Sequence, residues 1–351
     1  MSSKKFNKGL LATSIAMILA GGATPFAMAA EEAAEQDMEV IQVTGIRGSL
    51  KEALNTKRFS NSVVDAVSAE DVGKFPDADV GEALGRHNDV DAVSFTGSTE
   101  VGGLFMKYSG ESNLKTIGLE MGGKSPFLVL EDAKINDTLI DNAINSAFWN
   151  GGQNCSANMR QIIHSKVKDE FLDKVLKKIK NIKVGDPLDT ETNMGSMISK
   201  GHLAKVDGYI QKGIDEGASI LHGGVSDSNQ KGFFAKPTLF DNVKENMTIA
   251  QDEIFGPVLG VLTVNNTEEA LKIAKNSKYG LHASVFTQDI NKAFHIAKNL
   301  PCGTISINTF SEGDIKTPFG GYKQSGSLSR DQGTEALNQY LQTKTIWISH
   351  S

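Results

Sequence analysis

The stretch Gly118-Leu-Glu-Met-Gly-Gly-Lys-Ser-Pro-Phe-Leu-Val-Leu130 decides the fold class. Its first eight residues match the phosphate-binding pattern G-x-x-x-x-G-K-[ST] letter for letter. A phosphate-binding loop of this kind opens a helix, because the free N–H groups of the first helical turn hold the phosphates. Here Pro126 and the β-rich run 127–130 follow instead. The stretch therefore predicts a glycine turn that displays Glu120 and then enters a strand, and it argues against a nucleotide triphosphatase.

Strands and helices alternate outward from this stretch, as an α/β fold requires. The β-rich runs 161–164, Val258–Val264, 284–287 and 304–308 predict further strands. Between them, apolar residues recur three and four positions apart, which indicates amphipathic helices. The clearest of these helices is predicted at 135–148, and Gly151-Gly152 closes it. Three more helices are marked by the apolar sets Phe171, Val175, Leu176 and Ile179; Leu203, Val206, Tyr209, Ile210 and Ile214; and Ala270, Leu271, Ile273 and Ala274.

The composition is that of a globular protein and excludes several classes of function. Of the 351 residues, 39% are hydrophobic and 22% are charged, and the net charge is -6. An acidic chain without a stripe of Lys and Arg among aromatic residues offers no binding surface to nucleic acid. Its two cysteines, Cys155 and Cys302, are too few for a disulfide scaffold. They have no CxxC spacing and the seven histidines are scattered singly, so no metal site is predicted.

Cys155 is the candidate nucleophile of this sequence. The run Phe148-Trp-Asn-Gly-Gly-Gln-Asn-Cys155 ends a predicted helix in a glycine pair that presents a single thiol. A nucleophilic thiol needs partial exposure and local donors that lower its pKa. A lone cysteine is more often a small buried apolar residue. Cys302, in Leu-Pro-Cys-Gly ahead of a strand, fits that second description, whereas the polar, glycine-rich surroundings of Cys155 favour a nucleophile.

Other glycine-rich turns are candidates for holding a ligand. A predicted strand runs into Gly97 and Ser98 and then into a helix, which suits a phosphate and equally an ordinary turn. Glu253 and Phe255 lie in Gln-Asp-Glu-Ile-Phe-Gly-Pro, where an acidic residue and an aromatic ring stand beside a turn. The run 318–326 is a further glycine-rich loop with the same ambiguity. None of these turns identifies a function by itself.

In this order and spacing, the five motifs resemble the aldehyde dehydrogenase superfamily over about residues 87–348. The resemblance implies an α/β catalytic domain with an incomplete Rossmann-type NAD-binding domain, because the family's first half has no counterpart here. It also implies NAD or NADP as the cofactor and a small aldehyde as the substrate. By the same resemblance, Cys155 is the nucleophile and Glu120 the general base. The implied cofactor contacts are Gly97 and Ser98 at the pyrophosphate, Gly122 in the glycine turn, Glu253 at the nicotinamide ribose and Phe255 near the nicotinamide.

The resemblance is closest to members that oxidise aminoaldehydes, such as gamma-glutamyl-gamma-aminobutyraldehyde dehydrogenases. It is carried by the stretches 311–326 and 341–348. In the first stretch, Glu312 and Asp314 could hold a cationic substrate tail or could be solvated loop acids. The implied mechanism passes through a thioester on Cys155, which water activated by Glu120 releases as the acid.

We also expect the chain as written to show little or no aldehyde oxidation. The family's oxyanion-binding Asn and its adenosine-ribose Lys belong to the half that has no counterpart here. One missing oxyanion donor costs about a hundredfold to a thousandfold in rate. Family members form homo-oligomers through the strand that corresponds to 344–348, but the segment that pairs with this strand also lies in the missing half.

The N-terminus has the features of a secretory signal peptide. Lys4, Lys5 and Lys8 precede an apolar run at 9–20, and Ala27-Met-Ala29 supplies the small residues that a signal peptidase reads. The apolar run is shorter than the roughly 20 residues that span a bilayer, and no later segment is apolar enough to do so. A signal peptide implies a periplasmic or outer-membrane destination, whereas the dehydrogenase family implies the cytoplasm.

The segment 40–84 resembles the start of the plug domain of TonB-dependent outer-membrane receptors. The runs Val-Thr-Gly-Ile-Arg-Gly-Ser-Leu at 43–50 and Asp-Ala-Val-Ser-Ala-Glu-Asp-Val-Gly-Lys-Phe-Pro-Asp at 65–77 carry this resemblance. A fragment of such a receptor is therefore a second candidate function, and the chain is interpreted as a truncated chimera whose join lies within 81–86. The predicted segments are a signal peptide at 1–29, a largely disordered plug-like fragment at 30–86, a remnant of the NAD-binding domain at 87–119, the catalytic domain at 120–310, and at 311–351 the C-terminal loop with the return to the cofactor domain and the oligomerisation strand.

We expect residues 1–29 to direct export in a Gram-negative host, because the charged, apolar and small-residue regions follow one another in the required order. The measurement is the activity of a fused reporter enzyme that works only in the periplasm. A Leu11→Arg fusion, which interrupts the apolar run, is the matched control and should be inactive. A silent reporter on the unaltered segment would contradict the prediction.

Overall fold

The computed structural model describes residues 80–227, 229–327 and 329–350. The chain divides into two units, Met1–Asp71 and Val72–Ser351, and every described residue belongs to the second. The predicted signal peptide at 1–29 and the plug-like segment as far as residue 79 lie outside the described residues.

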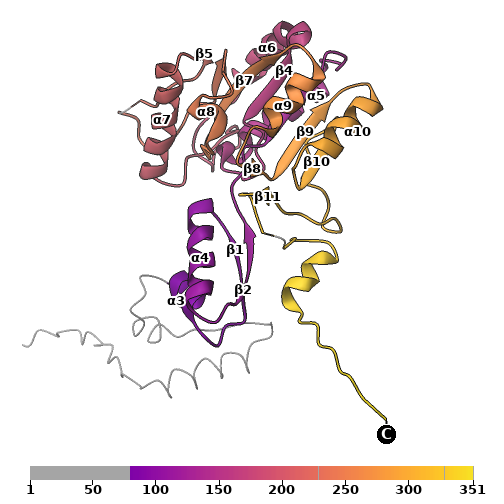
Figure 1. Ribbon diagram of the computed structural model, residues 1–351. Coiled ribbons are helices and arrows are strands. Elements are labelled where there is room, and N and C mark those ends of the chain that lie inside the picture. The colour runs from indigo at the N-terminus through magenta and orange to yellow at the C-terminus, as the bar shows by residue number, and fades with distance from the viewer. Residues whose placement is uncertain (1–79, 228, 328, 351) are drawn as a thin grey trace, which may run out of the picture. The chain divides into compact units, whose positions relative to one another are not determined.

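The largest sheet of the described unit has seven strands and lies in the upper part of Figure 1. Its strand order is β10-β9-β3-β4-β7-β6-β5, and every neighbouring pair is parallel except β5 and β6. The predicted α/β class is thereby confirmed, and the run after the glycine turn is a strand with all four residues buried. The strands are β3 Pro126–Val129, β4 Arg160–His164, β5 Ser219–His222, β6 Thr238–Asp241, β7 Val258–Val264, β9 His282–Phe286 and β10 Thr304–Ile307.

The sequence predicts the inner strands of this sheet better than its β5 edge. The runs expected at 161–164, Val258–Val264, 284–287 and 304–308 correspond to β4, β7, β9 and β10, with ends shifted by up to two residues. It does not predict β5 and β6, which have four residues each. The residues of β5 are partly exposed, so this strand lacks the apolar run by which a buried strand is recognised.

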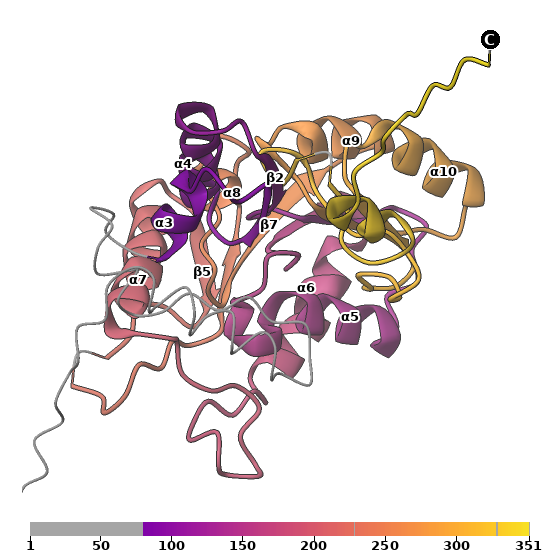
Figure 2. The same ribbon diagram turned by 90° about the horizontal axis from the view of Figure 1, so that it is seen from below.

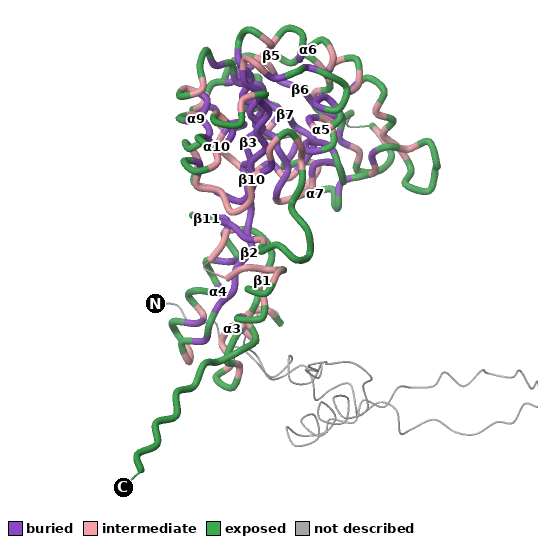
Figure 3. The backbone as a smooth tube through the Cα atoms, turned by 90° about the vertical axis from the view of Figure 1, so that its right-hand side faces the viewer, coloured by how far each residue is buried: buried purple, intermediate pink, exposed green. Residues whose placement is uncertain are grey.

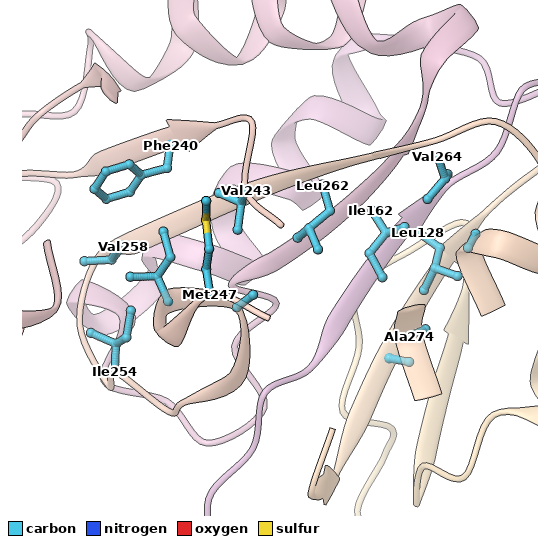
Figure 4. Close-up of a cluster of buried hydrophobic side chains, with 14 of the residues drawn as sticks. Leu128, Ile162, Phe240, Val243, Met247, Ile254, Val258, Leu262, Val264 and Ala274 are labelled. Carbon is cyan, nitrogen blue, oxygen red and sulfur yellow. The ribbon is translucent and has the colours of Figure 1, made fainter. Parts of the chain in front are cut away.

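Helices cover both faces of the sheet, with α5 and α6 on one face and α9 and α10 on the other (Figure 2). Neighbouring residues of a strand point to opposite faces. Leu128 and Ile162 accordingly join one core cluster, shown in Figure 4, while Phe127 and Ile163 join the other. The helix bounds are α5 Asp137–Phe148, α6 Ser165–Ile179, α7 Lys200–Asp215, α8 Thr248–Gln251, α9 Thr267–Lys275 and α10 Ile290–Asn299. Of these helices, the apolar period of the sequence predicts α5, α6, α7 and α9.

A smaller βαβ unit precedes this sheet. Strand β1 (Ala92–Thr96) pairs in parallel with β2 (Thr116–Glu120), and helix α4 (Thr99–Glu111) connects them. Helix α4 begins where the Ser98 hydroxyl accepts a hydrogen bond from the N–H of Val101, at 3.2 Å. The core of this βαβ unit is small and consists of Phe105, Ile117, Leu119 and Met121. In Figure 3, buried residues follow the strands of the large sheet, whereas exposed and intermediate ones dominate β1 and α4.

Helix α3 (Val80–Arg86) forms the last seven residues of the segment 30–86, the only part of that segment which the structure describes. The Arg86 guanidinium lies over the Tyr108 ring of α4, at 4.4 Å from its centroid, and forms an ion pair with Glu111 at 2.8 Å. Gly85 packs closely against the same ring. Residues 81–86, which suit both resemblances by sequence, therefore pack with the βαβ unit because a cation and an aromatic ring meet there.

The C-terminal residues return to the βαβ unit. Strand β11 (Tyr322–Lys323) pairs with β8 (Tyr279–Gly280), and the 3-10 helix η2 (Glu335–Tyr340) follows. The strand expected at 344–348 is not formed in the described chain, and Trp347 is 91% exposed. A strand requires a hydrogen-bonding neighbour, and no described segment pairs with these residues. Among the described residues, no helix combines the length and the apolar character needed to cross a membrane.

We expect Phe127→Ala to destabilise the fold strongly. Phe127 is fully buried in strand β3, and its ring stacks on that of Phe286 at 4.6 Å between centroids. Replacing a buried Phe by Ala costs about 3–5 kcal/mol in the free energy of unfolding. Urea unfolding of the purified chain measures this change. The control is Phe294→Ala, at a ring 57% exposed on α10, where the change should stay within about 0.5 kcal/mol. Equal effects of the two substitutions would disprove the assignment of the core.

Candidate active site

Cys155 lies in a loop, residues 153–158, that follows a tight corner after α5. We call this segment the thiol loop. The corner, η1 (Trp149–Gly152), contains Gly151 and Gly152 with φ of 64° and 71°. A Cβ on Gly152 would lie 2.6 Å from the backbone oxygen of Gly256. The corner therefore packs directly against the backbone just after Glu253, as only a glycine permits.

Glu253 reaches the double-glycine turn, Gly122-Gly123. Its Oε1 accepts a hydrogen bond from the N–H of Gly123 at 3.0 Å. A Cβ on Gly122 would lie 1.9 Å from Glu253 Oε2, and one on Gly123 would lie 2.4 Å from the backbone oxygen of Cys155. The turn thus brings Glu253 and the thiol loop together, although these two features lie far apart in the sequence.

Glu120 ends strand β2 just before this turn. It is only 7% exposed, and neither carboxylate oxygen has a hydrogen-bond partner among the described residues. Burial raises the pKa of Glu120 to about 8; the nearby Asp331 raises it further, and Arg330 opposes the shift. Below that pH the carboxyl is mainly protonated, and above it the group is a buried base. A buried acid with a raised pKa near neutrality is typical of a catalytic site.

The thiol of Cys155 differs from the sequence-based expectation of a lowered pKa. Burial, followed by the charges of Glu312 and Glu253 and more weakly Glu120, raises the pKa of Cys155 to about 11. A hydrogen bond from the backbone lowers the pKa, but it does not offset burial and three carboxylates. A neighbouring cation would stabilise the thiolate, and the carboxylates do the opposite.

Cys302 fits its prediction as a residue packed against the core. It contacts the cluster that contains Leu128 and lies beside the buried Arg160. Burial raises the pKa of Cys302 to about 12, although the Arg160 charge opposes the shift. At a given pH, Cys155 therefore carries the larger thiolate fraction of the two.

The two acids that could hold a cationic substrate tail occupy different positions. Glu312 Oε1 accepts a hydrogen bond from Asn154 Nδ2 at 3.1 Å and another from Ser156 Oγ. These residues flank Cys155, so Glu312 stands at the thiol. Asp314 instead accepts the N–H of Lys316 through Oδ1 at 2.9 Å, which shapes its own turn. The structure therefore separates Glu312 from Asp314, which the sequence treats alike.

Residues 53–346 match the model of the aldehyde dehydrogenase family, which is most of the chain. The chain belongs to the aldehyde dehydrogenase family. The matched stretch begins within the segment 30–86, so the family relationship extends further toward the N-terminus than the expected residue 87.

Individual members of the family show the same relationship. The aminoacetaldehyde dehydrogenase of Pseudomonas aeruginosa is 41% identical over 273 residues, which are 78% of this chain and 54% of that protein. The mitochondrial aldehyde dehydrogenase of Mesocricetus auratus is 43% identical over 268 residues, which are 76% of this chain and 53% of that protein. The chain therefore spans about half the length of these two relatives.

Solved structures agree in fold. The crystal structure of the aldehyde dehydrogenase KauB from Pseudomonas aeruginosa has a TM-score of 0.74 with 41% identity, covering 77% of this chain and 54% of that chain. An NAD+ complex of an aldehyde dehydrogenase from Bacillus cereus has a TM-score of 0.74 with 42% identity, covering 77% and 54%.

The remaining predicted site residues of the dehydrogenase chain lie on the elements around the turn. Gly97 donates its N–H to the backbone oxygen of Glu120 at 3.0 Å, and Ser98 caps the N-terminus of α4. Phe255 adopts φ of 57°, and its backbone oxygen is 2.6 Å from His202 Nε2. Gly97 is thus hydrogen-bonded to the strand that carries Glu120, and Phe255 belongs to the same turn as Glu253.

Lys124 is a residue of this site that sequence reasoning missed. It is 3% exposed, and its Nζ has no hydrogen-bond partner among the described residues. Burial and the Arg160 charge lower the pKa of Lys124 to about 7, whereas Glu253 and Asp252 raise it. In the sequence, Lys124 stands out only as the lysine of the phosphate-binding pattern in the Gly-Gly-Lys-Ser run. Once that pattern is rejected, nothing else in the sequence marks it as a site residue.

We expect iodoacetamide to modify Cys155 faster than Cys302, by about tenfold per unit of pKa difference at any pH below both values. The rate at Cys155 should rise with pH toward about 11, because only the thiolate reacts. Glu312→Gln should shift this rise to lower pH, since it removes the carboxylate that most strongly raises the pKa of the thiol. Mass spectrometry of the adducts against time measures the rates.

Two controls accompany this measurement. Cys155→Ser should abolish the fast phase, and Cys302→Ser should leave it unchanged. Asp314→Asn is matched to Glu312→Gln and should leave the pH profile in place. Preferential modification of Cys302 would refute the assignment of the reactive thiol.

Proposed function

We propose that this chain carries the thiol chemistry of an NAD-dependent enzyme that oxidises aldehydes, aminoaldehydes among them, to carboxylic acids. One observation carries the proposal: the double-glycine turn leaves room for Glu253 and the thiol loop, and it directly follows the buried Glu120. Family membership supports the same reaction.

Gly97, Ser98, Gly122, Glu253 and Phe255 would hold NAD or NADP. These residues fit such a group. Helix α4 has 13 residues and follows its N-cap residue Ser98, and a helix N-terminus favours the negative charge of a pyrophosphate. Related enzymes of 41% and 42% identity are described as complexes with NAD+. When bound, the cofactor accepts the hydrogen and electron pair that leave the aldehyde carbon.

Cys155 performs the first step by forming a bond from its sulfur to the carbonyl carbon of the aldehyde. The S–H bond breaks and the carbonyl oxygen takes up a proton, which gives a hemithioacetal. Because the thiol keeps its proton at neutral pH, with a pKa of about 11, this proton must move as the sulfur attacks. The backbone N–H of Cys155 would donate to the oxygen as its charge develops.

Glu120 performs the second step, after oxidation has turned the hemithioacetal into a thioester. Its carboxylate takes a proton from water, the water oxygen bonds to the acyl carbon, and the carbon–sulfur bond breaks to release the acid and Cys155. With a pKa of about 8, Glu120 is a stronger base than an exposed glutamate, yet a useful fraction of it is ionised near neutral pH.

Glu312 supports an aminoaldehyde as substrate, because its carboxylate stands beside the residues that flank Cys155. A cationic amine at the far end of the aldehyde would be attracted there. The relatives include an aminoacetaldehyde dehydrogenase, in agreement with such a substrate. Nothing in the described part of the chain favours the second candidate function, a fragment of a transport receptor.

We expect Cys155 to accept an acetyl group from p-nitrophenyl acetate, a reaction that needs the thiol and Glu120 but no cofactor. Release of p-nitrophenolate should show a burst, and mass spectrometry should find the acetyl group on Cys155. Glu120→Gln should keep the burst and slow the later hydrolysis by about a hundredfold or more, because the water loses its base. With an aminoaldehyde and NAD, the chain should form little or no NADH, and Cys155→Ser should form none.

Cys302→Ser is the matched control and should acylate normally, whereas Cys155→Ser should not acylate. An acetyl group found on Cys302, or hydrolysis that is equally fast without Glu120, would overturn the proposed roles.

A further inference from the structure

His282 occupies the centre of a buried polar network beneath the thiol loop. It is fully buried at the start of β9, and its ring stands edge-on to Phe310, 5.2 Å between centroids. On one side, Nδ1 lies 3.5 Å from Asn158 Nδ2. On the other side, Nε2 lies 2.9 Å from Ser306 Oγ and 3.0 Å from the backbone oxygen of Ser311. The described mechanism uses none of these contacts.

The two ends of the network lie on the thiol loop and on the segment that carries Glu312. Asn158 ends the thiol loop, three residues after Cys155. Ser311 directly precedes Glu312, and Glu312 in turn accepts hydrogen bonds from Asn154 and Ser156. The contacts therefore close a ring that runs from the thiol loop through Asn158 and His282 to Ser311 and Glu312, and back to the thiol loop.

The hydrogen bonds of its neighbours assign the proton on His282. Asn158 accepts from Ser284 Oγ at 3.0 Å through Oδ1 and donates to the backbone oxygen of Pro126 at 3.0 Å through Nδ2. The amide nitrogen therefore faces His282, and Nδ1 must accept. Nε2 then carries the hydrogen and donates toward Ser311. A second ring proton would face the Asn158 donor, and burial lowers the pKa of His282 to about 4, so the neutral form is present near neutral pH.

Ser306 strengthens the same connection. Its hydroxyl donates to the backbone oxygen of Ser311 at 2.7 Å and accepts the N–H of Ser311 at 3.2 Å. Ser311 is thus held at both of its backbone groups by side chains from β9 and β10. A loop held in this way presents its next residue, Glu312, in one position, because reorienting it would leave buried polar groups unpaired.

We propose that His282 is a positioning residue for substrate recognition, which holds Ser311 so that Glu312 stays against the two neighbours of Cys155 and the thiol prefers cationic substrates. The inference rests on the proposed function, in that it takes Cys155 as the nucleophile. His282 contacts neither the thiol nor Glu312 and acts through Ser311.

The test measures how charge affects the reaction of Cys155 itself, so it needs no cofactor and no turnover. In a Cys302→Ser background, Cys155 is treated with a cationic trimethylammonioethyl or an anionic sulfonatoethyl methanethiosulfonate. In each case the thiolate takes the reagent's alkylthio group and releases methanesulfinate. The ratio of the two rate constants, divided by the same ratio for a free thiol, reports local charge, because both reagents meet the same thiolate.

We expect a ratio of about ten or more in the parent chain, since a charge a few ångströms away in a partly buried site changes a rate by at least that factor. Glu312→Gln should lower the ratio by about threefold or more. His282→Leu and Ser306→Ala should lower it similarly, and His282→Gln, which keeps a donor toward Ser311, should restore it. In the Glu312→Gln background, His282→Leu should lower the ratio little further, because both substitutions remove the same effect of the Glu312 charge on the thiol.

The matched control is His164→Leu. His164 is also buried, and its Nε2 is 2.8 Å from the backbone oxygen of Asn265, away from the thiol loop. This variant should keep the parent ratio. A lower ratio in Glu312→Gln with an unchanged ratio in both His282→Leu and Ser306→Ala would overturn the proposal, as would an equal loss in His164→Leu. Acylation of Cys155 by p-nitrophenyl acetate tests the proposed function separately. A failure of the charge test is therefore distinguishable from a failure of the proposed function.

Discussion

Gly122 and Gly123 leave room for groups from two distant parts of the chain. The Glu253 carboxylate occupies the space where a side chain of Gly122 would stand, and the backbone oxygen of Cys155 does so at Gly123. The backbone N–H of Gly123 then fixes the carboxylate by a hydrogen bond. A larger residue at either position would separate the thiol loop from Glu253, so the whole site depends on two missing Cβ atoms.

The electrostatics of the site follow from this close approach. Three carboxylates surround one thiol, and each of them raises its pKa. Burial also raises the pKa of Glu253, while the Gly123 N–H and the buried Lys124 lower it. Lys124 in turn has a lowered pKa, because burial and Arg160 oppose its charge. A cation entering this site would stabilise the carboxylates and the thiolate together.

The scaffold supplies the rigidity that such an arrangement needs. The turn enters β3, whose residues are buried on both faces between the two core clusters. The thiol loop enters β4, which pairs with β3. His282 begins β9, the other neighbour of β3. The thiol, the turn and the polar network are thus anchored at the same edge of three adjacent parallel strands, and this common origin is what lets short loops hold them together.

The sequence by itself determines the α/β class, the strand after Pro126 and the helices with a clear apolar period. It also indicates Cys155, Glu120 and Glu253 as candidate site residues. These features depend on local pattern and on motif order. Only the tertiary structure decides that Glu312 stands at the thiol while Asp314 shapes a turn, that carboxylates raise the pKa of Cys155, and that residues 81–86 pack on Tyr108. It alone brings His282 to Ser311 and buries Lys124 with no hydrogen-bond partner for its Nζ among the described residues. These outcomes depend on burial and on contacts between residues far apart in the chain, and periodicity and spacing contain no information about either.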